Sequence, residues 1–539
     1  MKGVTITILA AVVAASSAQK IRQVLVDAST TIGTLKNLQG TNSADTAYSP
    51  PGGQDTIHNK DPALGALFPQ YGIEHVLIYT FPDVFHGFGK TGAAGDPSAN
   101  ANYNWTAADD YVHYVTSNGA KASIQFAPTN GTNADVSSPE ILAQVGSMIT
   151  DRYMNGAYNS GFHDALALFE FYPEADVVRS NAEICDQNFE FFAHFSRAVS
   201  KTSPKVGVSA WGGNQAYPVD TNYSVYDPYV SRFYKDCRER NVPIKAASFH
   251  FTNQQFSFDP YDIVRVVDKF RVEVLVPAGL PDLPIWATEY EPAPYSALPT
   301  SASAIKSFNN PSFFASFSLG VSMYAQDTSI AQAMPWPGFG YNGTGAGGQP
   351  FHGYFNRSAS GPVPLNAAKA LPLQADLVRE TPHRIKVQRG SSEDGFAVLA
   401  GRSPNNATVQ ILLNNYQFDF DIAYEVTAQM VPLFNTSTTA YPVLQDNGLL
   451  NGEAVCFQFG ACLTFPQPRW RNNTSTAYRL EVLNLPWDQS SKYRITVRRV
   501  ADGVTGDVYL AREGRGNSID IQLPFPGNAQ DLVVIETVR

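Results

Sequence analysis

Two glutamates stand at the ends of short apolar runs, and their spacing could support acid–base chemistry. The first, Glu174, follows the run 165–172 and Pro173, which ends a strand because proline cannot donate to the ladder. The second, Glu289, ends the run 284–289. Cleavage of a glycosidic bond needs one carboxyl group that protonates the leaving oxygen and an ionised one that attacks or stabilises the anomeric carbon. A lone glutamate at a strand end is more often a salt-bridged rim residue, so the hypothesis rests on the pair.

Eight short strand-like runs predict the elements that would position this pair. They lie roughly 35–46 residues apart, the repeat length of a strand, a helix and two loops, at 37–42, 75–80, 120–126, 165–172, 206–211, 246–251, 284–289 and 320–326. Helical signals lie between them at 135–154, 181–200, 228–240 and 260–276. The pattern predicts a closed (β/α)8 TIM barrel over 38–370. An open doubly wound sheet is the alternative, but no GxGxxG follows any strand.

The carboxyl ends of the strands in such a barrel meet at one mouth. Glu174 and Glu289 follow the fourth and seventh runs, so we expect them to face one another across that mouth. Side chains alternate along a strand, which predicts that Ile285, Ala287 and Glu289 share the inward row.

After residue 371 the pattern changes to short, partly alternating runs separated by Gly, Pro, Asn and Ser turns. These runs are 385–388, 395–400, 408–413, 477–482, 493–498, 507–511, 518–523 and 532–536. They predict a C-terminal β-sandwich domain over 371–539. The early run 21–27 also alternates, so residues 19–37 are expected to contribute a strand to the same sandwich.

Two motifs carry a resemblance to a known family. FEFYPE at 169–174 resembles the acid/base motif of clan A glycoside hydrolases, and ATEYE at 287–291 resembles their nucleophile motif. The layout is similar to glycoside hydrolase family 39 of the fungal secreted type, whose members join a (β/α)8 barrel to a β-sandwich and act on β-xylosidic, α-L-iduronidic or arabinofuranosyl linkages. The resemblance implies a retaining double displacement with Glu174 as the acid/base and Glu289 as the nucleophile. It also matches Glu170 and His250 to family positions.

One residue departs from the family pattern. The clan usually has asparagine immediately before the acid/base glutamate, where it binds the 2-hydroxyl of the sugar, but this chain has Pro173. Proline offers neither a polar side chain nor an N–H. Either another group holds that hydroxyl, or the hydroxyl is substituted, absent or differently oriented in the preferred substrate.

Six further residues are candidates for substrate binding. His250 could bond a hydroxyl or orient Glu289, although a satisfied buried histidine is an equally common use. The remaining candidates are Tyr290 beside the nucleophile, Trp211 and Trp336, which could stack on sugar faces, and Gln326 with Asp327 at the end of the eighth run.

These features predict a hydrolase that removes terminal glycosyl residues from a plant polysaccharide or gum, and the resemblance implies that these residues are xylosyl or arabinofuranosyl. The Gly-rich stretch 331–353 lacks GxxxxGK[ST] and reads as a rim loop that closes one end of the pocket, which favours terminal sugars. The partner is an oligo- or polysaccharide, and no cofactor is implied because carboxylates suffice. Two alternatives stay open: an endo-acting clan A hydrolase with an open groove, and a catalytically inactive carbohydrate-binding wall protein.

The first 18 residues predict a secretory signal peptide. Lys2 precedes the apolar run 4–15 and the small residues 16–18, and the run is too short to span a bilayer. We therefore expect a secreted, extracellular protein with no membrane partner. The formal charge of −10 argues against a nucleic-acid partner. Asn-X-Ser/Thr acceptors suggest N-linked glycans at residues 104, 130, 222, 342, 356, 406, 435, 472 and 473.

Four cysteines, Cys185, Cys237, Cys456 and Cys462, allow three disulfide pairings. We favour Cys456–Cys462, because CFQFGAC is a short loop between strand-like runs. Cys185–Cys237 would then join two helices. No Cys/His spacing predicts a metal site.

Overall fold

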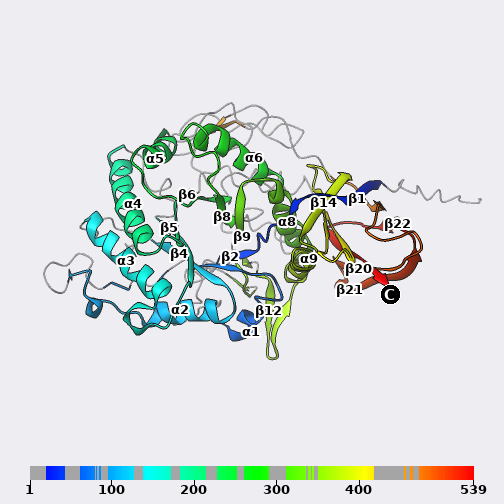
Figure 1. Ribbon diagram of the computed structural model, residues 1–539, viewed down its shortest axis with the longest axis horizontal. Coiled ribbons are helices and arrows are strands. Elements are labelled where there is room, and N and C mark those ends of the chain that lie inside the picture. Colours follow the sequence, from blue (N-terminus) through cyan, green and yellow to red (C-terminus); the bar gives the residue numbers. More distant parts are fainter. Residues whose placement is uncertain are drawn as a thin grey trace, which may run out of the picture.

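The computed structural model describes residues 20–42, 61–78, 81, 84–85, 95–126, 138–171, 182–213, 228–251, 260–290, 311–335, 338–341, 343–344, 350–351, 353–417, 454–456, 462–464 and 473–538. These residues form a parallel barrel and a C-terminal sheet domain that lie next to each other along the long axis of the molecule (Figure 1). No helix among them is long and apolar enough to cross a membrane.

The barrel has eight parallel strands that pair in chain order. They are β2 (Gly40–Asn42), β3 (His75–Ile78), β4 (Lys121–Phe126), β5 (Leu166–Phe171), β6 (Gly207–Gly213), β7 (Ala246–Phe251), β8 (Ile285–Tyr290) and β9 (Ile330–Pro335). The ring closes where the Ala333 N–H donates to the Leu38 carbonyl at 3.1 Å, beside a parallel bridge between Gln39 and Ala333. The predicted (β/α)8 barrel is therefore confirmed.

Helices cover the outside of the barrel (Figure 1). They are α1 (Pro62–Gly65), α2 (Thr106–Ser117), α3 (Pro139–Asn155), α4 (Ala182–Thr202), α5 (Pro228–Glu239), α6 (Asp262–Phe270), α8 (Pro311–Tyr324) and α9 (Asn366–Glu380), with short turns η4 (Asn100–Asn102), η5 (Ala157–Asn159), η7 (Arg271–Leu275) and η9 (Ala325–Asp327). Local signals set their ends. Pro139 opens α3, where the Ser138 hydroxyl accepts the Ile141 N–H at 3.2 Å, and Gly156 ends it with φ 77°.

The eighth predicted strand is wrong. Residues 320–326 belong to the end of α8 and to η9, and the last barrel strand is β9. Helix α8 contacts α6 of the barrel. It also contacts α9 and the C-terminal strands β15, β16 and β23. It is therefore buried on its different sides, and a short, mostly apolar run of this kind cannot be told from a buried strand by periodicity.

This shift removes two residues from the predicted binding site. Gln326 and Asp327 precede β9, so they lie at the amino end of the barrel, opposite the mouth. The Gln326 side chain exchanges two 2.9 Å hydrogen bonds with the backbone of Lys36, and the Asp327 carboxylate pairs with both Arg384 nitrogens at 2.6 and 2.8 Å. Their predicted contact with substrate is wrong.

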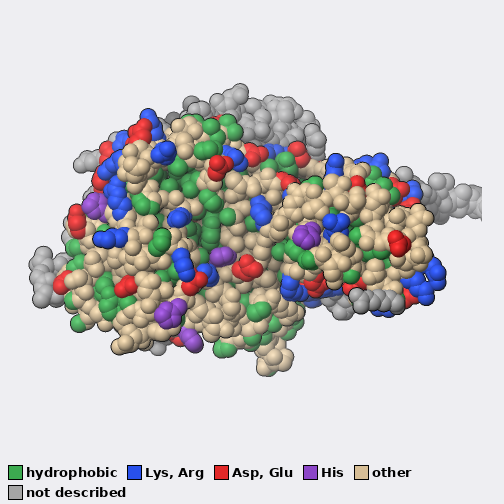
Figure 2. Space-filling view, in the orientation of Figure 1, with side chains coloured by type: hydrophobic (Ala, Val, Ile, Leu, Met, Phe, Trp, Pro, Cys, Tyr) green, Lys and Arg blue, Asp and Glu red, His purple; other side chains and the backbone are tan. Residues whose placement is uncertain are grey.

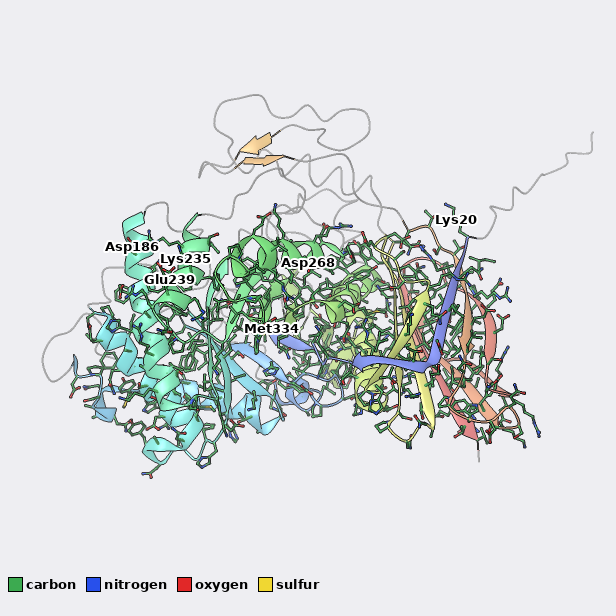
Figure 3. The ribbon with its side chains drawn as sticks, turned by 45° about the horizontal axis from the view of Figure 1, so that its top comes forward. Lys20, Asp186, Lys235, Glu239, Asp268 and Met334 are labelled. Carbon is green, nitrogen blue, oxygen red and sulfur yellow. The ribbon has the colours of Figure 1, made fainter. Side chains whose placement is uncertain are left out.

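The C-terminal domain is a mixed sheet in the order β21-β20-β23-β16-β15-β14-β1-β19-β22. Strand β1, drawn in blue in Figure 3, runs from Lys20 across this sheet, antiparallel to β14 and parallel to β19. The strands are β1 (Ile21–Thr34), β14 (His383–Arg389), β15 (Phe396–Arg402), β16 (Thr408–Asn415), β19 (Ala477–Leu483), β20 (Lys492–Ala501), β21 (Val504–Arg515), β22 (Ile519–Pro524) and β23 (Ala529–Val538). The predicted accessory β-domain after the barrel is confirmed.

Short hairpins complete the description. They are formed by β10 (Gly343–Thr344) with β11 (Pro350–Phe351), β12 (Phe355–Ser358) with β13 (Gly361–Pro364), and β17 (Ala454–Cys456) with β18 (Cys462–Thr464).

The two domains share one apolar layer rather than a linker. Leu319 and Met323 of α8 and Leu373 of α9 pack against Leu412 of β16 and Leu532 of β23. Because α8 and α9 also cover the barrel, the two cores meet on the same pair of helices.

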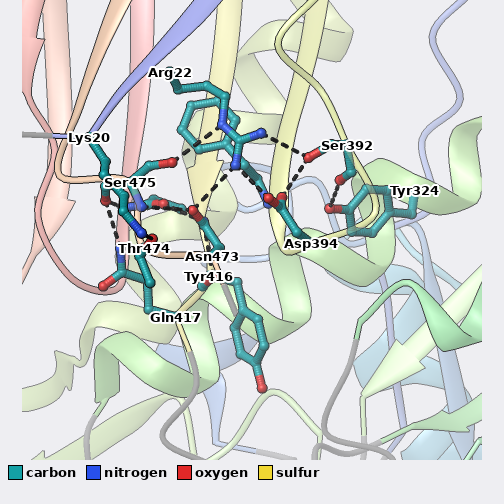
Figure 4. Close-up of polar contacts among 12 residues, drawn as sticks. Lys20, Arg22, Tyr324, Ser392, Asp394, Tyr416, Gln417, Asn473, Thr474 and Ser475 are labelled. Atoms are coloured by element: carbon teal, nitrogen blue, oxygen red, sulfur yellow. Dashed lines mark hydrogen bonds and ion pairs between the residues drawn. The ribbon is translucent and has the colours of Figure 1, made fainter. Parts of the chain in front are cut away.

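One predicted glycan acceptor is buried. Asn473 is 2% exposed; its amide donates to Asn415 Oδ1 at 2.6 Å and to the Tyr416 carbonyl at 3.2 Å. Its Oδ1 accepts from the Ser475 N–H at 3.0 Å and from the Arg22 guanidinium at 3.5 Å (Figure 4). The folded domain has no room for a glycan on Asn473, so that expectation is wrong.

The predicted Cys185–Cys237 bridge is also wrong. Cys237 of α5 carries a free thiol that is 1% exposed and packs in the barrel core. Helix α5 turns this residue inward, and burial raises the pKa of the thiol. Cys456 and Cys462 lie directly opposite each other in the β17–β18 hairpin, but their side chains lie outside the described part of the chain, so that bridge stays a prediction.

A buried ion pair in the C-terminal core gives a stability prediction. Arg499 is 4% exposed, and its guanidinium donates to both Asp531 oxygens at 2.7 and 2.6 Å. Arg499→Ala is expected to lower the free energy of unfolding by about 3–5 kcal/mol, because the Asp531 carboxylate stays buried without its partner. Denaturant unfolding measures this. The control, Arg479→Ala, breaks a similar two-bond pair with Asp520 on the exposed surface and should barely move the midpoint. Similar losses in both variants would contradict the account.

Candidate active site

Polar side chains from five strands meet inside the barrel near its carboxyl end. They are Asn42 of β2, Gln125 of β4, Glu170 of β5, His250 of β7 and Glu289 of β8. None is more than 5% exposed. Charged side chains are buried to this degree only when hydrogen bonds or opposite charges stabilise them.

Glu170 accepts hydrogen bonds on both carboxylate oxygens. Thr288 Oγ1 donates to Oε1 at 2.6 Å, Gln125 Nε2 donates to Oε2 at 3.1 Å, and His250 Nε2 lies 3.8 Å from the same Oε2. Burial raises the pKa of Glu170, but the His250 imidazole and the Thr288 hydroxyl outweigh it, so the pKa lies below its usual value. The lowered pKa favours the ionised form of Glu170.

Glu289 is held by neighbours on two sides. Asn42 Nδ2 donates to its Oε1 at 3.1 Å, and His250 Nδ1 lies 3.4 Å from its Oε2. The imidazole of His250 thus lies between two carboxylates, with one ring nitrogen toward each. A carboxylate fixed between an amide donor and an imidazole is suited to attack or stabilise a cationic carbon.

A β-bulge at Thr288 turns Glu289 into the barrel. Strand β7 pairs His250 with Glu289 and the preceding residue with Ala287, so Thr288 has no partner of its own there. Ile285 and Ala287 pack in the outer core between strands and helices. The expectation that they share the inward row with Glu289 is wrong, because the extra residue resets the alternation.

The structure brings two of the predicted site residues together, His250 and Glu289. Glu174 and Trp336 lie outside the described residues. Trp211 lies in β6, but its side chain is likewise not described. The roles of Glu174, Trp336 and Trp211 therefore stay predictions.

Tyr290 does not point into the site. Its side chain points out of the barrel because it follows the bulge. It is 4% exposed and lines a small pocket with Ser318 and Leu319 of α8 and Gln374 of α9. Burial raises the pKa of its hydroxyl. Its predicted contact with substrate is wrong.

Sequence reasoning missed Asn42, Gln125 and Thr288. Each is a polar residue inside or at the end of one of the predicted strands. A polar side chain at an inward position of a barrel strand, near its carboxyl end, is the signal that would have found the first two. Thr288 could not be placed, because nothing in the sequence marks the bulge.

No group of three or more His, Cys, Asp or Glu side chains within the described ranges is arranged to hold a metal ion. On the face drawn in Figure 2, acidic and basic side chains are interspersed.

The fold is shared with solved glycoside hydrolases. The chain is similar to a glucosidase from Croceicoccus marinus, with a TM-score of 0.70 and 22% identity over 96% of this chain and 100% of that one. It is also similar to the GH39 enzyme from Xanthomonas axonopodis pv. citri (TM-score 0.62, 15% identity, 98% and 100% covered) and to a monomeric β-xylosidase from Caulobacter crescentus (TM-score 0.57, 13% identity, 96% and 100% covered). No family model and no curated protein matches the sequence. The likeness shows the fold: a parallel (β/α)8 barrel with an accessory β-domain.

The hydrogen bond from Thr288 to Glu170 gives a pH-dependent prediction. Thr288→Val is expected to lower the free energy of unfolding at pH 7 by about 1.5–3 kcal/mol, the usual worth of a hydrogen bond to a charged group. The folded pKa of Glu170 lies below the ordinary 4.5, so this stability is present above pH 4.5 and is lost as the pH falls through the folded value. The difference in the free energy of unfolding between variant and wild type should therefore decrease as the pH falls.

Urea unfolding from pH 7 down to pH 3 measures that difference. The matched control is Thr150→Val, an equally buried threonine on α3 whose hydroxyl donates to the Gly146 carbonyl rather than to a carboxylate. A difference that stays constant with pH in Thr288→Val, as it should in Thr150→Val, would show that Glu170 is not ionised in the folded protein.

Proposed function

We propose that the protein is a secreted retaining glycoside hydrolase that removes terminal glycosyl residues, xylosyl or arabinofuranosyl, from plant polysaccharide or gum. The observation that carries the proposal is the buried Glu289 carboxylate, held by Asn42 and His250 near the carboxyl end of β8. Active sites in barrels of this kind lie at that end. The fold shared with several glycoside hydrolases supports the same class.

The mechanism uses two glutamates in two steps. Glu289 attacks the anomeric carbon and forms a glycosyl–enzyme ester, while Glu174 gives its proton to the departing oxygen. Glu174 then takes a proton from water, which attacks the same carbon and releases Glu289 as the carboxylate. Two displacements at one carbon retain its configuration. Such a mechanism requires the two carboxyl groups to lie about 5–5.5 Å apart.

The substrate proposal rests on the resemblance in the sequence and on the neighbours in structure. Solved proteins with this fold include the Caulobacter β-xylosidase and an α-L-arabinofuranosidase from Thermotoga maritima. Release of single sugars from a polymer, rather than oligomers, would support the terminal mode of action over the endo-acting alternative. Secretion follows from the signal-like residues 1–18.

Substitution of the two glutamates tests the proposal. Glu289→Gln is expected to lower kcat/KM on 4-nitrophenyl glycosides by about 10⁴-fold, equivalent to about 5.5 kcal/mol of transition-state stabilisation. Glu174→Gln is expected to lower kcat/KM by about 10²–10⁴-fold on oligosaccharides, whose leaving oxygen needs a proton, and much less on 4-nitrophenyl glycosides, whose leaving group departs as 4-nitrophenolate. In Glu289→Ala, added azide should restore turnover and give a glycosyl azide of inverted configuration, because azide replaces the nucleophile.

Proton NMR of the wild-type reaction should show the retained anomer as the first product. Glu190→Gln, on the outer face of α4, is the control and should match wild type. An inverted first product would reject the double displacement. Full activity in Glu289→Gln would reject the proposed nucleophile.

A further inference from the structure

The Asn42 side chain is satisfied at one end only. Its Nδ2 lies 3.1 Å from Glu289 Oε1 and 3.1 Å from the Thr288 carbonyl. Both neighbours are acceptors, so the nitrogen must be on that side and Oδ1 must be on the other. Asn42 is fully buried, and its Oδ1 has no hydrogen-bond partner among the residues that the structure describes. A buried acceptor is costly to leave unpaired, so this position calls for a donor.

The backbone of Asn42 is fixed by the segment that follows β9. The Phe339 N–H donates to Thr41 Oγ1 at 2.6 Å. A Cβ on Gly338 would lie 1.6 Å from the Asn42 carbonyl oxygen, so only glycine allows this close approach. Asn42 cannot shift away from Glu289 on this side, and the direction of its Oδ1 is set before any ligand arrives.

We infer that Asn42 Oδ1 accepts a hydrogen bond from the sugar hydroxyl on the carbon next to the anomeric carbon, which makes Asn42 a specificity-determining residue. The inference rests on the proposed function. Glu289 can attack only when the anomeric carbon lies about 3–3.5 Å from one of its oxygens, which brings the sugar ring against Asn42.

The chemistry of the sugar ring determines which of its groups can bind Asn42 Oδ1. Two ring atoms flank the anomeric carbon: the ring oxygen, which can only accept, and a carbon whose hydroxyl can donate. An acceptor such as Oδ1 can be satisfied only by the hydroxyl. A site that hydrogen-bonds a substrate hydroxyl rejects the analogue that lacks it, because its own buried acceptor is then left unpaired. The protein should therefore prefer sugars that carry a free 2-hydroxyl.

The experiment crosses two substrates with three variants. Each protein is assayed on the 4-nitrophenyl glycoside that wild type hydrolyses best and on its 2-deoxy analogue, after subtraction of spontaneous hydrolysis. Asn42→Ala is expected to lower kcat/KM about 100-fold on the first substrate but only about 10-fold on the second, where only the contact with Glu289 is lost. Asn42→Asp keeps an acceptor oxygen, so it should lose rate on both substrates and keep the preference. Thr288→Val is the matched control, because it acts on Glu170 and should lower both rates by one factor.

Three outcomes would overturn the inference. Equal losses on the two substrates in a folded Asn42→Ala variant overturn the inference and leave the proposed function standing. Should Asn42→Ala fail to fold, Asn42→Asp takes its place, and loss of the preference there overturns the inference. If wild type hydrolyses no glycoside of a xylosyl, arabinofuranosyl and uronosyl panel, and Glu289→Gln behaves identically, the proposed function fails and this inference fails with it.

Discussion

The cost of burying negative charge inside the barrel governs this structure. Glu170 and Glu289 project into an interior that excludes most solvent, and an uncompensated carboxylate there would be expensive. The protein meets this cost with donors from several strands: Gln125 and Thr288 for Glu170, Asn42 for Glu289, and the His250 imidazole between the two. These contacts fix the direction of both carboxylates, and those around Glu170 lower its pKa. Acid–base and nucleophilic chemistry needs that fixed arrangement, since a group that reorients during the reaction loses transition-state stabilisation.

Other parts of the fold position these buried side chains. The bulge at Thr288 places two consecutive side chains inside the barrel, so that one strand supplies both a donor to Glu170 and the Glu289 carboxylate. Gly338 lies against the backbone carbonyl of Asn42. Farther away, α8 and α9 pack against both the barrel and the C-terminal sheet.

The sequence predicts much of this arrangement because strand order in a repeating strand–helix chain is strongly constrained. Seven of the eight barrel strands, the C-terminal β-domain and the proximity of residues 250 and 289 follow from strand-like runs and from polar residues at their ends. The prediction from hydrophobic periodicity failed where the barrel packs against the C-terminal sheet. Helix α8 is buried on every side and so lost the periodicity that marks a helix, and Gln326 and Asp327 were misplaced as a result. Tyr290 was misplaced by local geometry, since a one-residue bulge cannot be read from residue types.

The sequence also leaves a chemical question, for which we propose Asn42 as the answer. Pro173 cannot hold a sugar hydroxyl, and nothing in the local motif shows what replaces it. The orphaned oxygen of Asn42 comes from a strand more than 100 residues earlier, and only the closed barrel brings it beside Glu289. Long-range contacts of this kind are set by tertiary closure and not by local spacing.

Covalent capture of the nucleophile tests the central claim most directly. The protein would be treated with cyclitol epoxides of xylose and arabinofuranose configuration, digested, and analysed by mass spectrometry. The account predicts a single ester adduct on the peptide that contains Glu289 and loss of activity in proportion to labelling. An adduct on a different carboxylate, such as Glu170, or complete inactivation without labelling of Glu289, would contradict it.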